Sequence, residues 1–312
     1  MTEEATPPNR NEPHRILIVR GGALGDFVLT LPVFRALRTA WPKAEIDGLT
    51  ARSYGRLAVE GGLMRAWRCL DDPCWAEFFV PDGELDTAAA AWLGQFDRVI
   101  SFLHDPKNVW RKNVARCVEG SFLQGIHRPV DTHGVPASKV LMGALSEWGL
   151  DEVDPVPVFS LGGVPNGKVA FHPGSGSVEK NWPEANWVEW ARRWLERGRT
   201  PLLMVAGEAE RDRVGRMVQA INHDQLEVLV DAPIETVGRR LEGCVGFVGH
   251  DSGVTHLAAA LGVPCLALWG PSCEVVWRPL NEQVSVLKSS RGLMGITVDE
   301  VLAATGKMVP CH

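Results

Sequence analysis

Three glycine-containing turns in this sequence carry side chains that could take part in chemistry. The first is GGALGD, residues 21–26, in which the acidic residue Asp26 follows Gly22 and Gly25. A carboxylate in this position could act as a general base and accept a proton from an incoming hydroxyl group. It could equally bond the free N–H groups at the start of a helix, which is a purely structural role. The turn by itself gives the two roles equal weight.

The same turn argues against a dinucleotide site. Its glycines, Gly21, Gly22 and Gly25, do not follow the GxGxxG spacing of that motif. The motif also needs an acidic residue at the end of the next strand, and the segment 45–50 ends in Leu-Thr instead.

The second turn is FHPGSGSVEKNWP, residues 171–183. It offers backbone N–H groups at Gly174, the hydroxyl groups of Ser175 and Ser177, and the cation of Lys180. These groups could together hold a diphosphate. The GxxxxGK[ST] order of a P-loop is absent, and an ordinary serine-rich turn with a solvated lysine is a slightly stronger explanation of this loop taken alone.

The third turn, GHDSGVTHL at 249–257, places polar groups around the start of an alanine-rich helix. A helix start attracts anions, and a carboxylate beside it suits sugar hydroxyls better than phosphates. His256 could equally pack against the backbone. The candidate ligand-binding residues of this turn are Asp251, Ser252, Gly253, Val254 and His256.

A weaker signal lies in VAGEAERDR, residues 205–213, where an acidic residue could hold ribose hydroxyls. Glu210 is our choice for this contact and Glu208 is the alternative. Acidic residues are also favoured in any first helical turn, which is the stronger explanation for both.

The elements that position these turns alternate between strand-like and helix-like segments, which predicts parallel sheets with crossover helices. A Pro- and Gly-rich stretch at 151–167 separates two such sets. We therefore expect a disordered tail (1–14) and two Rossmann-like domains (15–155 and 156–312) that face each other across a cleft. Expected strands are 15–20, 45–50, 97–102, 123–127, 168–172, 201–207, 226–230, 245–251 and 265–270; expected helices are 26–40, 133–149, 183–198, 208–222, 234–243 and 253–262.

Composition limits the function classes. The 312 residues are 45% hydrophobic and 22% charged with a formal charge of −6, and neither half is basic, which argues against a nucleic-acid partner. No apolar stretch has the length of a membrane span and the N-terminus does not resemble a signal peptide. The seven cysteines form no CxxC pair, so we expect reduced thiols and a cytoplasmic protein. No ligand set demands a metal.

With these turns in order, the chain resembles the lipopolysaccharide heptosyltransferases of glycosyltransferase family 9 over nearly its whole length. The resemblance is carried by GGALGDFVLTLPVFRALR, FHPGSGSVEKNWP and DSGVTHLAAALGVPCLALWGPS. It implies a GT-B fold in which the N-terminal domain (15–155) is the acceptor side and the C-terminal domain (156–312) binds the nucleotide sugar. It also implies an ADP-activated heptose as the donor substrate, no cofactor and no required metal. It also implies inverting transfer to a sugar of a lipid-anchored acceptor such as the lipopolysaccharide inner core, with room for a transient contact at the inner membrane.

Residue by residue, the resemblance makes Asp26 the base, with Gly22 and Gly25 on the acceptor side. It assigns Lys180 and the Ser175/Ser177 loop to the phosphates and Asp251 to the hydroxyls of the donor sugar. The stretch SFLHDPKNVWRKN, residues 101–113, departs from the family pattern where an acceptor would be contacted. The alternatives are a GT-B enzyme that uses another nucleotide sugar, a nucleotide-sugar epimerase or hydrolase, and a non-catalytic sensor.

Overall fold

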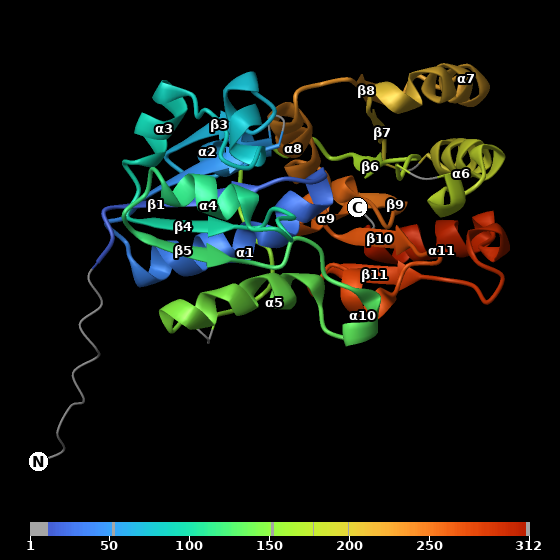
Figure 1. Cartoon of the computed structure of the whole chain (residues 1–312). Coiled ribbons are helices and arrows are strands. Elements are labelled where there is room, and N and C mark those ends of the chain that lie inside the picture. The colour runs from blue at the N-terminus through green and yellow to red at the C-terminus, as the bar shows by residue number, and fades with distance from the viewer. Residues whose placement is uncertain (1–11, 52–53, 151–152, 177, 199, 310–312) are drawn as a thin grey trace, which may run out of the picture.

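The computed structural model describes residues 12–309 except 52–53, 151–152, 177 and 199. The chain forms two α/β units, each built on one sheet, which lie side by side (Figure 1). The first sheet has five strands in the order β3-β2-β1-β4-β5, and the second has six in the order β11-β10-β9-β6-β7-β8. Every strand pairing in the described part of the chain is parallel.

The first unit contains the following elements, where η marks a 3-10 helix. They are β1 (Arg15–Arg20), α1 (Leu24–Ala40), β2 (Glu45–Thr50), α2 (Tyr54–Glu60), β3 (Ala66–Cys69), η1 (Pro73–Phe79), α3 (Thr87–Leu93), β4 (Arg98–Ser101), α4 (Val109–Ala115), β5 (Ser121–Gln124), η2 (Asp131–His133), α5 (Ala137–Met142) and η3 (Gly143–Trp148).

The second unit follows a segment, 153–168, that has no regular structure. Its elements are β6 (Val169–Phe171), η4 (Val178–Lys180), α6 (Glu184–Glu196), β7 (Leu202–Ala206), η5 (Glu208–Glu210), α7 (Arg211–Ile221), β8 (Leu226–Val230), α8 (Ile234–Glu242), β9 (Gly246–His250), α9 (Gly253–Ala260), β10 (Cys265–Leu268), α10 (Glu274–Trp277), β11 (Val284–Leu287), η6 (Leu293–Gly295) and α11 (Val298–Met308).

Each sheet reverses its strand order once, and these reversals locate the ligand site. The first sheet reverses between β1 and β4, and the second between β6 and β9. In open parallel sheets, ligands bind beyond the carboxyl ends of the strands at such a reversal. The three chemically interesting turns follow β1, β6 and β9, so the topology brings all of them to these two points.

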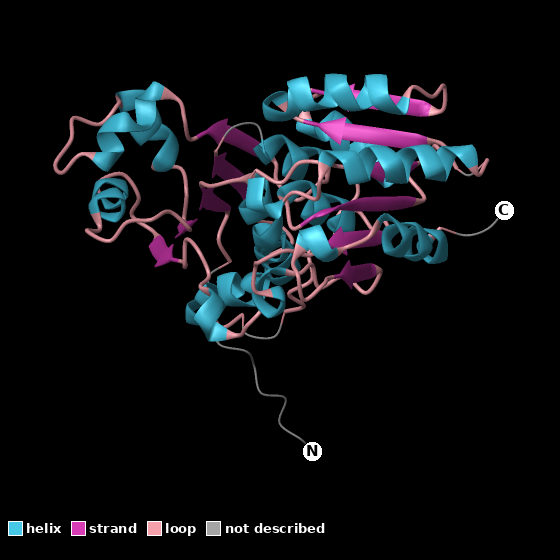
Figure 2. Ribbon diagram, turned by 90° about the vertical axis from the view of Figure 1, so that its right-hand side faces the viewer, coloured by secondary structure: helices cyan, strands magenta, loops and turns pink. Residues whose placement is uncertain are grey.

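Apolar burial explains why the strands and helices pack as they do. The middle strands are buried on both faces, and Ile16, Leu17, Ile18 and Val19 of β1 have no exposed surface. Strands of this kind read as continuous apolar runs and need helices on both sides of the sheet. In the second unit, α6 covers β6 with aromatic rings: Trp187 stacks on Phe171, with ring centroids 5.6 Å apart. Figure 2 shows the strands of this sheet with helices packed along them.

The two units are joined by more than the connecting segment. One apolar cluster contains residues of α1 and α2 together with residues of α8 and α9. Two ion pairs also cross between α2 and α8: Arg56 with Glu235, 2.8 Å apart, and Glu60 with Arg239. The relative placement of the two sheets therefore rests on a shared apolar core and on ion pairs nearer the surface.

Two expected elements were wrong in extent. The helix expected at 133–149 is split into η2, α5 and η3, because Pro136 disfavours helical backbone at the residue before it and α5 can begin only after it. The strand expected at 123–127 is β5, which ends at Gln124 because its neighbour β4 ends at Ser101. The sequence pattern predicted no element at β11, α2, α4, α10 or α11. In the ambiguous region 63–95 it allowed a short strand and a helix around DTAAAAWLG, and these are β3 and α3.

The tail expected at 1–14 lies mostly outside the described residues. Within the described part, the backbone N–H of His14 donates to the Asp97 carboxylate at 2.7 Å. The domain boundaries near 155 stay a prediction.

Candidate active site

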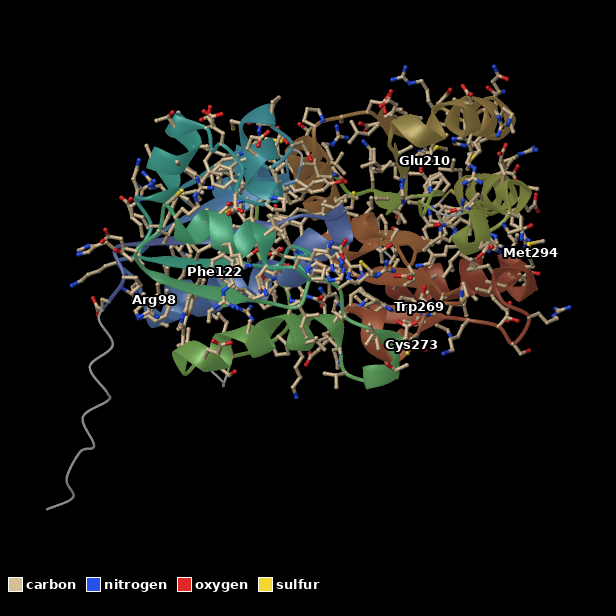
Figure 3. The ribbon with its side chains drawn as sticks, viewed as in Figure 1. Arg98, Phe122, Glu210, Trp269, Cys273 and Met294 are labelled. Atoms are coloured by element: carbon tan, nitrogen blue, oxygen red, sulfur yellow. The ribbon has the colours of Figure 1, made fainter. Side chains whose placement is uncertain are left out.

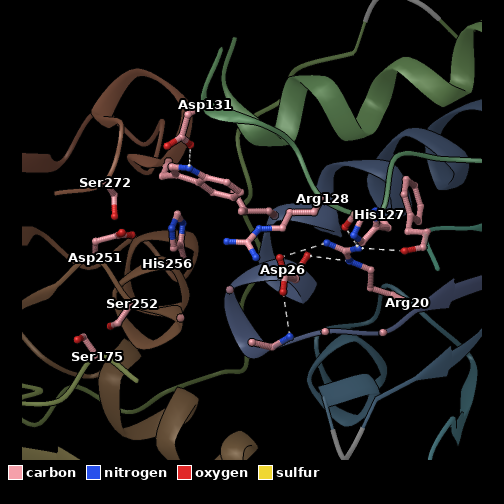
Figure 4. Close-up of a pocket in the computed structure, with 18 of the residues that line it drawn as sticks. Arg20, Asp26, His127, Arg128, Asp131, Ser175, Asp251, Ser252, His256 and Ser272 are labelled. Atoms are coloured by element: carbon pink, nitrogen blue, oxygen red, sulfur yellow. Dashed lines mark hydrogen bonds and ion pairs between the residues drawn. The ribbon is translucent and has the colours of Figure 1, made fainter. Parts of the chain in front are cut away.

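A pocket of about 810 Å³ lies between the two units, at the carboxyl ends of β1, β4, β6 and β9 (Figure 4). Residues from both units line it, as expected for a site between two Rossmann-like sheets. Nine of the predicted site residues are among them: Gly22, Gly25, Asp26, Ser175, Lys180, Asp251, Ser252, Gly253 and His256. The structure thus brings the three turns into one space, with Asp26 facing the other two.

Asp26 makes the structural contact that the sequence allowed, and it also faces the pocket. It is the third residue of α1, and its Oδ2 atom accepts a hydrogen bond of 2.9 Å from the backbone N–H of Ala23 just before the helix. This contact satisfies one of the free N–H groups at the helix start. The carboxylate is nevertheless 30% exposed, and it lines the pocket. The structural bond occupies one oxygen and leaves Oδ1 for other contacts.

Gly22 leaves the room that this carboxylate needs. Its φ angle is +93°, a value that side chains disfavour, and a Cβ atom there would lie 2.6 Å from Oδ2 of Asp26. Gly253 has a different reason: a Cβ there would lie 2.7 Å from the Gly25 nitrogen, whereas a Cβ on Gly25 would lie 3.4 Å from the Gly253 Cα. The starts of α1 and α9 therefore approach closely at a pair of glycines, one from each unit.

Lys180 and Asp251 contact each other in the second unit. Lys180 Nζ donates to Asp251 Oδ2 at 2.7 Å, and the Asp251 side chain is largely buried. An ammonium group has three donors, so Lys180 can hold this carboxylate and still donate to a phosphate oxygen. Asp251 lies across the pocket from Asp26 (Figure 4), and its ion pair with Lys180 holds the cation in the pocket lining.

The start of α9 presents backbone donors to the same wall. Ser252 precedes the helix, and its hydroxyl accepts the N–H of Thr255 at 3.4 Å, which caps the helix. Gly253 lines the pocket, whereas Val254 lines a neighbouring pocket instead. His256 also lines the site, but it is buried, and burial lowers its pKa. It is held against the backbone of Trp277, so the packing explanation for His256 holds alongside its place in the pocket.

The residue that shapes the loop after β6 was not predicted from the sequence. His250, fully buried at the end of β9, accepts the backbone N–H of Trp182 at Nε2 (2.7 Å) and donates from Nδ1 to the carbonyl of Gly174 (3.2 Å). Burial lowers its pKa to about 3, so the ring is neutral. Its position inside GHDSG, next to the residues already chosen, was the available signal. The Ser175 hydroxyl in this loop donates to Asn181 at 2.8 Å, and Ser177 lies outside the described residues.

The neighbouring pocket, about 500 Å³, bears on the choice between the two glutamates. Glu208 and Val254 line it with apolar side chains of β7 and α8. Glu210 is not among the lining residues: its Oε2 accepts the N–H of Gly207 at 2.9 Å, and a Cβ on Gly174 would lie 2.4 Å from its Oε1. Figure 3 labels Glu210 beside α7. Glu210 thus supports the loop at Gly174, and the ribose contact stays a prediction for either glutamate.

The wall on the side of the first unit carries basic side chains beside Asp26 and Asp131, and these basic residues were not predicted from the sequence. Arg20, His104, His127 and Arg128 line the pocket there, and the rings of His104 and His127 lie 4.5 Å apart. The pKa of His127 is lowered by burial and then by the positive charges of His104 and the two arginines. His104 belongs to the stretch 101–113 that departed from the family pattern, so this departure was the only signal in the sequence.

Among the described residues, no three His, Cys, Asp or Glu side chains come together as a metal site would require. In the same part of the chain, no helix combines the length and the apolar character needed to cross a membrane.

Comparisons with known proteins agree on one family. Residues 146–297 match the model of glycosyltransferase family 9 (heptosyltransferase). The chain is 32% identical over 287 residues to lipopolysaccharide heptosyltransferase 1 of Escherichia coli K12, covering 83% of this chain and 88% of that protein. It is 27% identical over 303 residues to lipopolysaccharide heptosyltransferase 1 of Pseudomonas aeruginosa, covering 83% and 79%.

Solved structures of heptosyltransferases have the same fold. The structure of the E. coli ADP-heptose lps heptosyltransferase II superposes with a TM-score of 0.78 at 18% identity, covering 94% of this chain and 98% of that one. The expected GT-B arrangement of two Rossmann-like units is thereby confirmed. Together with the pocket between the sheets, these matches show that the chain belongs to glycosyltransferase family 9, the heptosyltransferases.

Proposed function

We propose that this glycosyltransferase moves a heptose from ADP-heptose to a sugar of a lipid-anchored acceptor, such as the inner core of lipopolysaccharide. The observation that carries the proposal is that a candidate base and a candidate diphosphate-binding site face each other in one pocket. Asp26 lies on one wall, and Lys180, Asp251 and the start of α9 lie on the other. The names of the relatives, lipopolysaccharide heptosyltransferases among them, support the choice of donor and acceptor.

The reaction follows from this opposition. The acceptor hydroxyl attacks the anomeric carbon from the face opposite the diphosphate, so the configuration inverts. Asp26 takes the hydroxyl proton as the new C–O bond forms. The bond to the diphosphate breaks, and the charge that grows on the leaving ADP is stabilised by Lys180 and the N–H groups at the start of α9. This cation and these dipoles supply the stabilisation that a metal provides in other enzymes, so no metal is required.

Donor placement follows from the neighbouring contacts. Asp251 accepts hydrogen bonds from hydroxyls of the donor sugar, next to Lys180 on the diphosphate. The pocket behind α9 combines apolar residues, Val205, Ile234 and Val237 among them, with the charged residues Glu208, Arg211 and Asp231. This mixture suits a nucleoside, which has an apolar base face and polar ribose hydroxyls. Its lining includes Val254, so the start of α9 lies between the nucleoside and sugar sites.

We further propose that the protein is cytoplasmic and touches the inner membrane transiently when it takes up its lipid-anchored acceptor. The exposed apolar residues Ile126 and Val130 support this contact, because they flank the pocket residues His127 and Arg128. Co-sedimentation with vesicles of anionic lipids measures it. Binding that is lost in an Ile126→Ser/Val130→Ser variant, with turnover of a short soluble acceptor unchanged, supports the contact; binding that persists contradicts it.

Thermal stabilisation by nucleotides tests the donor. ADP, UDP and GDP are compared side by side, each alone and as a diphosphate sugar. A ligand at 100 times its dissociation constant adds about 2.7 kcal/mol to the free energy of unfolding. Selective stabilisation by ADP and ADP-heptose is the expected result. Selective stabilisation by UDP or GDP would favour the alternative of another nucleotide sugar, and product formed without acceptor would favour an epimerase or hydrolase.

The Asp26→Asn variant tests the base. The amide keeps the shape and can still accept the N–H of Ala23, but it cannot take a proton. We expect turnover to fall by about 100-fold or more while the affinity for ADP changes less than two-fold. Near-normal turnover in this variant would show that Asp26 is not the base.

A further inference from the structure

The last residue of β1, Arg20, is a buried charge with an unusual set of contacts. Its side chain is only 2% exposed, and it lies directly behind Asp26 in the wall of the pocket (Figure 4). Burying a guanidinium group is unfavourable unless its donors and its charge are matched. Its contacts therefore show what the residue is needed for.

Two of its three nitrogens bind backbone carbonyls. Nε donates to the carbonyl of Asp26 at 3.2 Å, and Nη1 donates to the carbonyls of His127 at 2.8 Å and Phe102 at 3.3 Å. Asp26 belongs to α1, Phe102 follows β4 and His127 follows β5. One guanidinium group thus ties together the three segments that surround the proposed base.

The third nitrogen faces the carboxylate itself. Nη2 is buried and makes no hydrogen bond to any described residue, and it lies 3.5 Å from Oδ1 of Asp26. Burial lowers the pKa of Arg20, and the negative charge of Asp26 partly offsets that effect. The other oxygen, Oδ2, is bound by the N–H of Ala23, so each carboxylate oxygen has its own positive neighbour.

We propose that Arg20 is a positioning residue for Asp26. It holds the helix start by the Asp26 carbonyl and the carboxylate by its charge, so that one face of the carboxylate stays turned toward the acceptor hydroxyl. The inference rests on the proposed function, in which Asp26 is the base. A misplacement of about 1 Å at a reacting group can cost about 100-fold in rate, so a residue that only positions the base can matter greatly for turnover.

The planar fork of arginine is required for this task. It donates in several fixed directions at once, whereas a lysine is a single flexible point charge. We expect Arg20→Lys to keep the buried charge and fold, but to lower kcat about ten-fold. We expect Arg20→Met to lower kcat about 100-fold, with the KM for the acceptor and the affinity for ADP changed less than two-fold.

The matched control is Arg116→Met. Arg116 also donates to a backbone carbonyl, that of Gly83 at 2.9 Å, but it lies outside the pocket lining. The loss of a carbonyl-bound arginine is thus common to both variants. Arg116 is exposed, so only Arg20→Met removes a buried charge and a contact with Asp26. A kcat for Arg20→Met equal to that of the control overturns the proposal.

A double-mutant cycle separates positioning from an independent role. In the Asp26→Asn background, Arg20→Met should cause no further loss of kcat, because a residue that acts through Asp26 has nothing left to act on. Losses that multiply would overturn the proposal. A normal rate in Asp26→Asn alone would instead refute the proposed base, so the two failures are distinguishable.

Chemical rescue provides a second readout that does not depend on Arg20→Met folding. In Arg20→Ala, added methylguanidinium should restore part of kcat, because it can occupy the space left behind the carboxylate. The same compound should not restore Asp26→Asn. If Arg20→Met proves unfolded, a wild-type kcat in Arg20→Lys overturns the proposal and a lowered kcat with unchanged ADP affinity supports it.

Discussion

At the residue scale, side chains in this pocket serve the fold and the proposed chemistry at once. Asp26 bonds the N–H of Ala23 at the start of α1 and also lines the pocket. Lys180 pairs with Asp251, and His256 packs against Trp277 while it faces the same space. A loss of activity alone is therefore ambiguous at these positions. For each variant, ligand affinity and turnover must therefore be measured separately.

Arg128 is a position where an effect on acceptor binding can be distinguished from an effect on donor binding. It lines the pocket on the side of the first unit, beside His104 and His127 and opposite the donor turns. An anionic group on the acceptor would be attracted there. We expect Arg128→Met to raise the KM for the acceptor about ten-fold, equivalent to about 1.4 kcal/mol, and to leave ADP affinity unchanged.

Steady-state kinetics with the acceptor varied, together with calorimetry of ADP binding, measure this difference. The control is Arg111→Met, because Arg111 lies in the first unit but not in the pocket lining. An equal rise in acceptor KM for both variants, or weaker ADP binding in Arg128→Met, would contradict a specific acceptor contact.

At the element scale, turns at strand ends decide the geometry of the site. The turn after β1 needs Gly22 because of both its φ angle and the nearness of the carboxylate. The turn after β6 is fixed by two hydrogen bonds between its backbone and the ring of His250 at the end of β9. The turn after β1 thus depends on a residue without a side chain, and the turn after β6 depends on a residue outside its own motif.

Gly22→Ala separates backbone strain from contact with the base. Gly62 has a similar φ of +69°, and a Cβ there would meet nothing within 4 Å. We expect both alanine variants to lose roughly 1–3 kcal/mol of stability from strain. Only Gly22→Ala should also lose turnover, because its methyl group must displace Asp26. Thermal unfolding and kcat measure the two effects, and equal turnover in the two variants would argue against this view.

The lowered pKa values of two buried histidines lead us to expect a loss of folding stability in mild acid. Burial lowers the pKa of His172 to about 4 and that of His250 to about 3, below the ordinary value near 6.5. The folded state therefore holds fewer protons than the unfolded state between these values. The stabilisation is complete above about pH 6.5 and is lost as the pH falls toward 4, by up to about 1.4 kcal/mol per pH unit for each ring.

Unfolding midpoints between pH 7.5 and 5 measure this dependence. A His250→Gln variant, which removes one of the two rings, should show a shallower slope although its stability at pH 7.5 is lower. An unchanged slope would mean that His250 is not responsible.

At the scale of the whole molecule, the site exists only because the two units are held at one distance. Glycines let α1 and α9 approach, apolar residues of four helices share a core, and ion pairs join α2 to α8. A further bond crosses at the pocket: Trp277 Nε1 of α10 donates to the carboxylate of Asp131 in η2 (Figure 4).

Trp277→Phe tests this bond between the units. The ring remains, but its donor is lost, and a net hydrogen bond contributes about 1 kcal/mol. We expect a raised KM for both substrates and a larger radius of gyration in scattering without ligand. Trp269→Phe is the control, because its Nε1 donates to Ser272 within the same unit. Adding Asp131→Asn to Trp277→Phe should change nothing further, and additive losses would contradict the bond.

Much of the fold was predictable because parallel α/β units repeat a local pattern. The expected strands 15–20, 45–50 and 226–230 agree with β1, β2 and β8. Buried strands can be recognised in the sequence as apolar runs, and glycine-containing turns indicate where they end. The expected helix 133–149 and the unassigned β11 and α11 lack such clear signals, since short or broken elements depend on packing partners.

The sequence by itself determined the alternation of strands and helices, the three turns and the candidate residues on them, because these follow from local composition and spacing. Only the tertiary structure decided which residues face one another. Lys180 meets Asp251 across 71 positions, His250 reaches Gly174 across 76 and Arg20 reaches His127 across 107. Such contacts depend on strand order and on the distance between the two sheets, which no local pattern in the chain encodes.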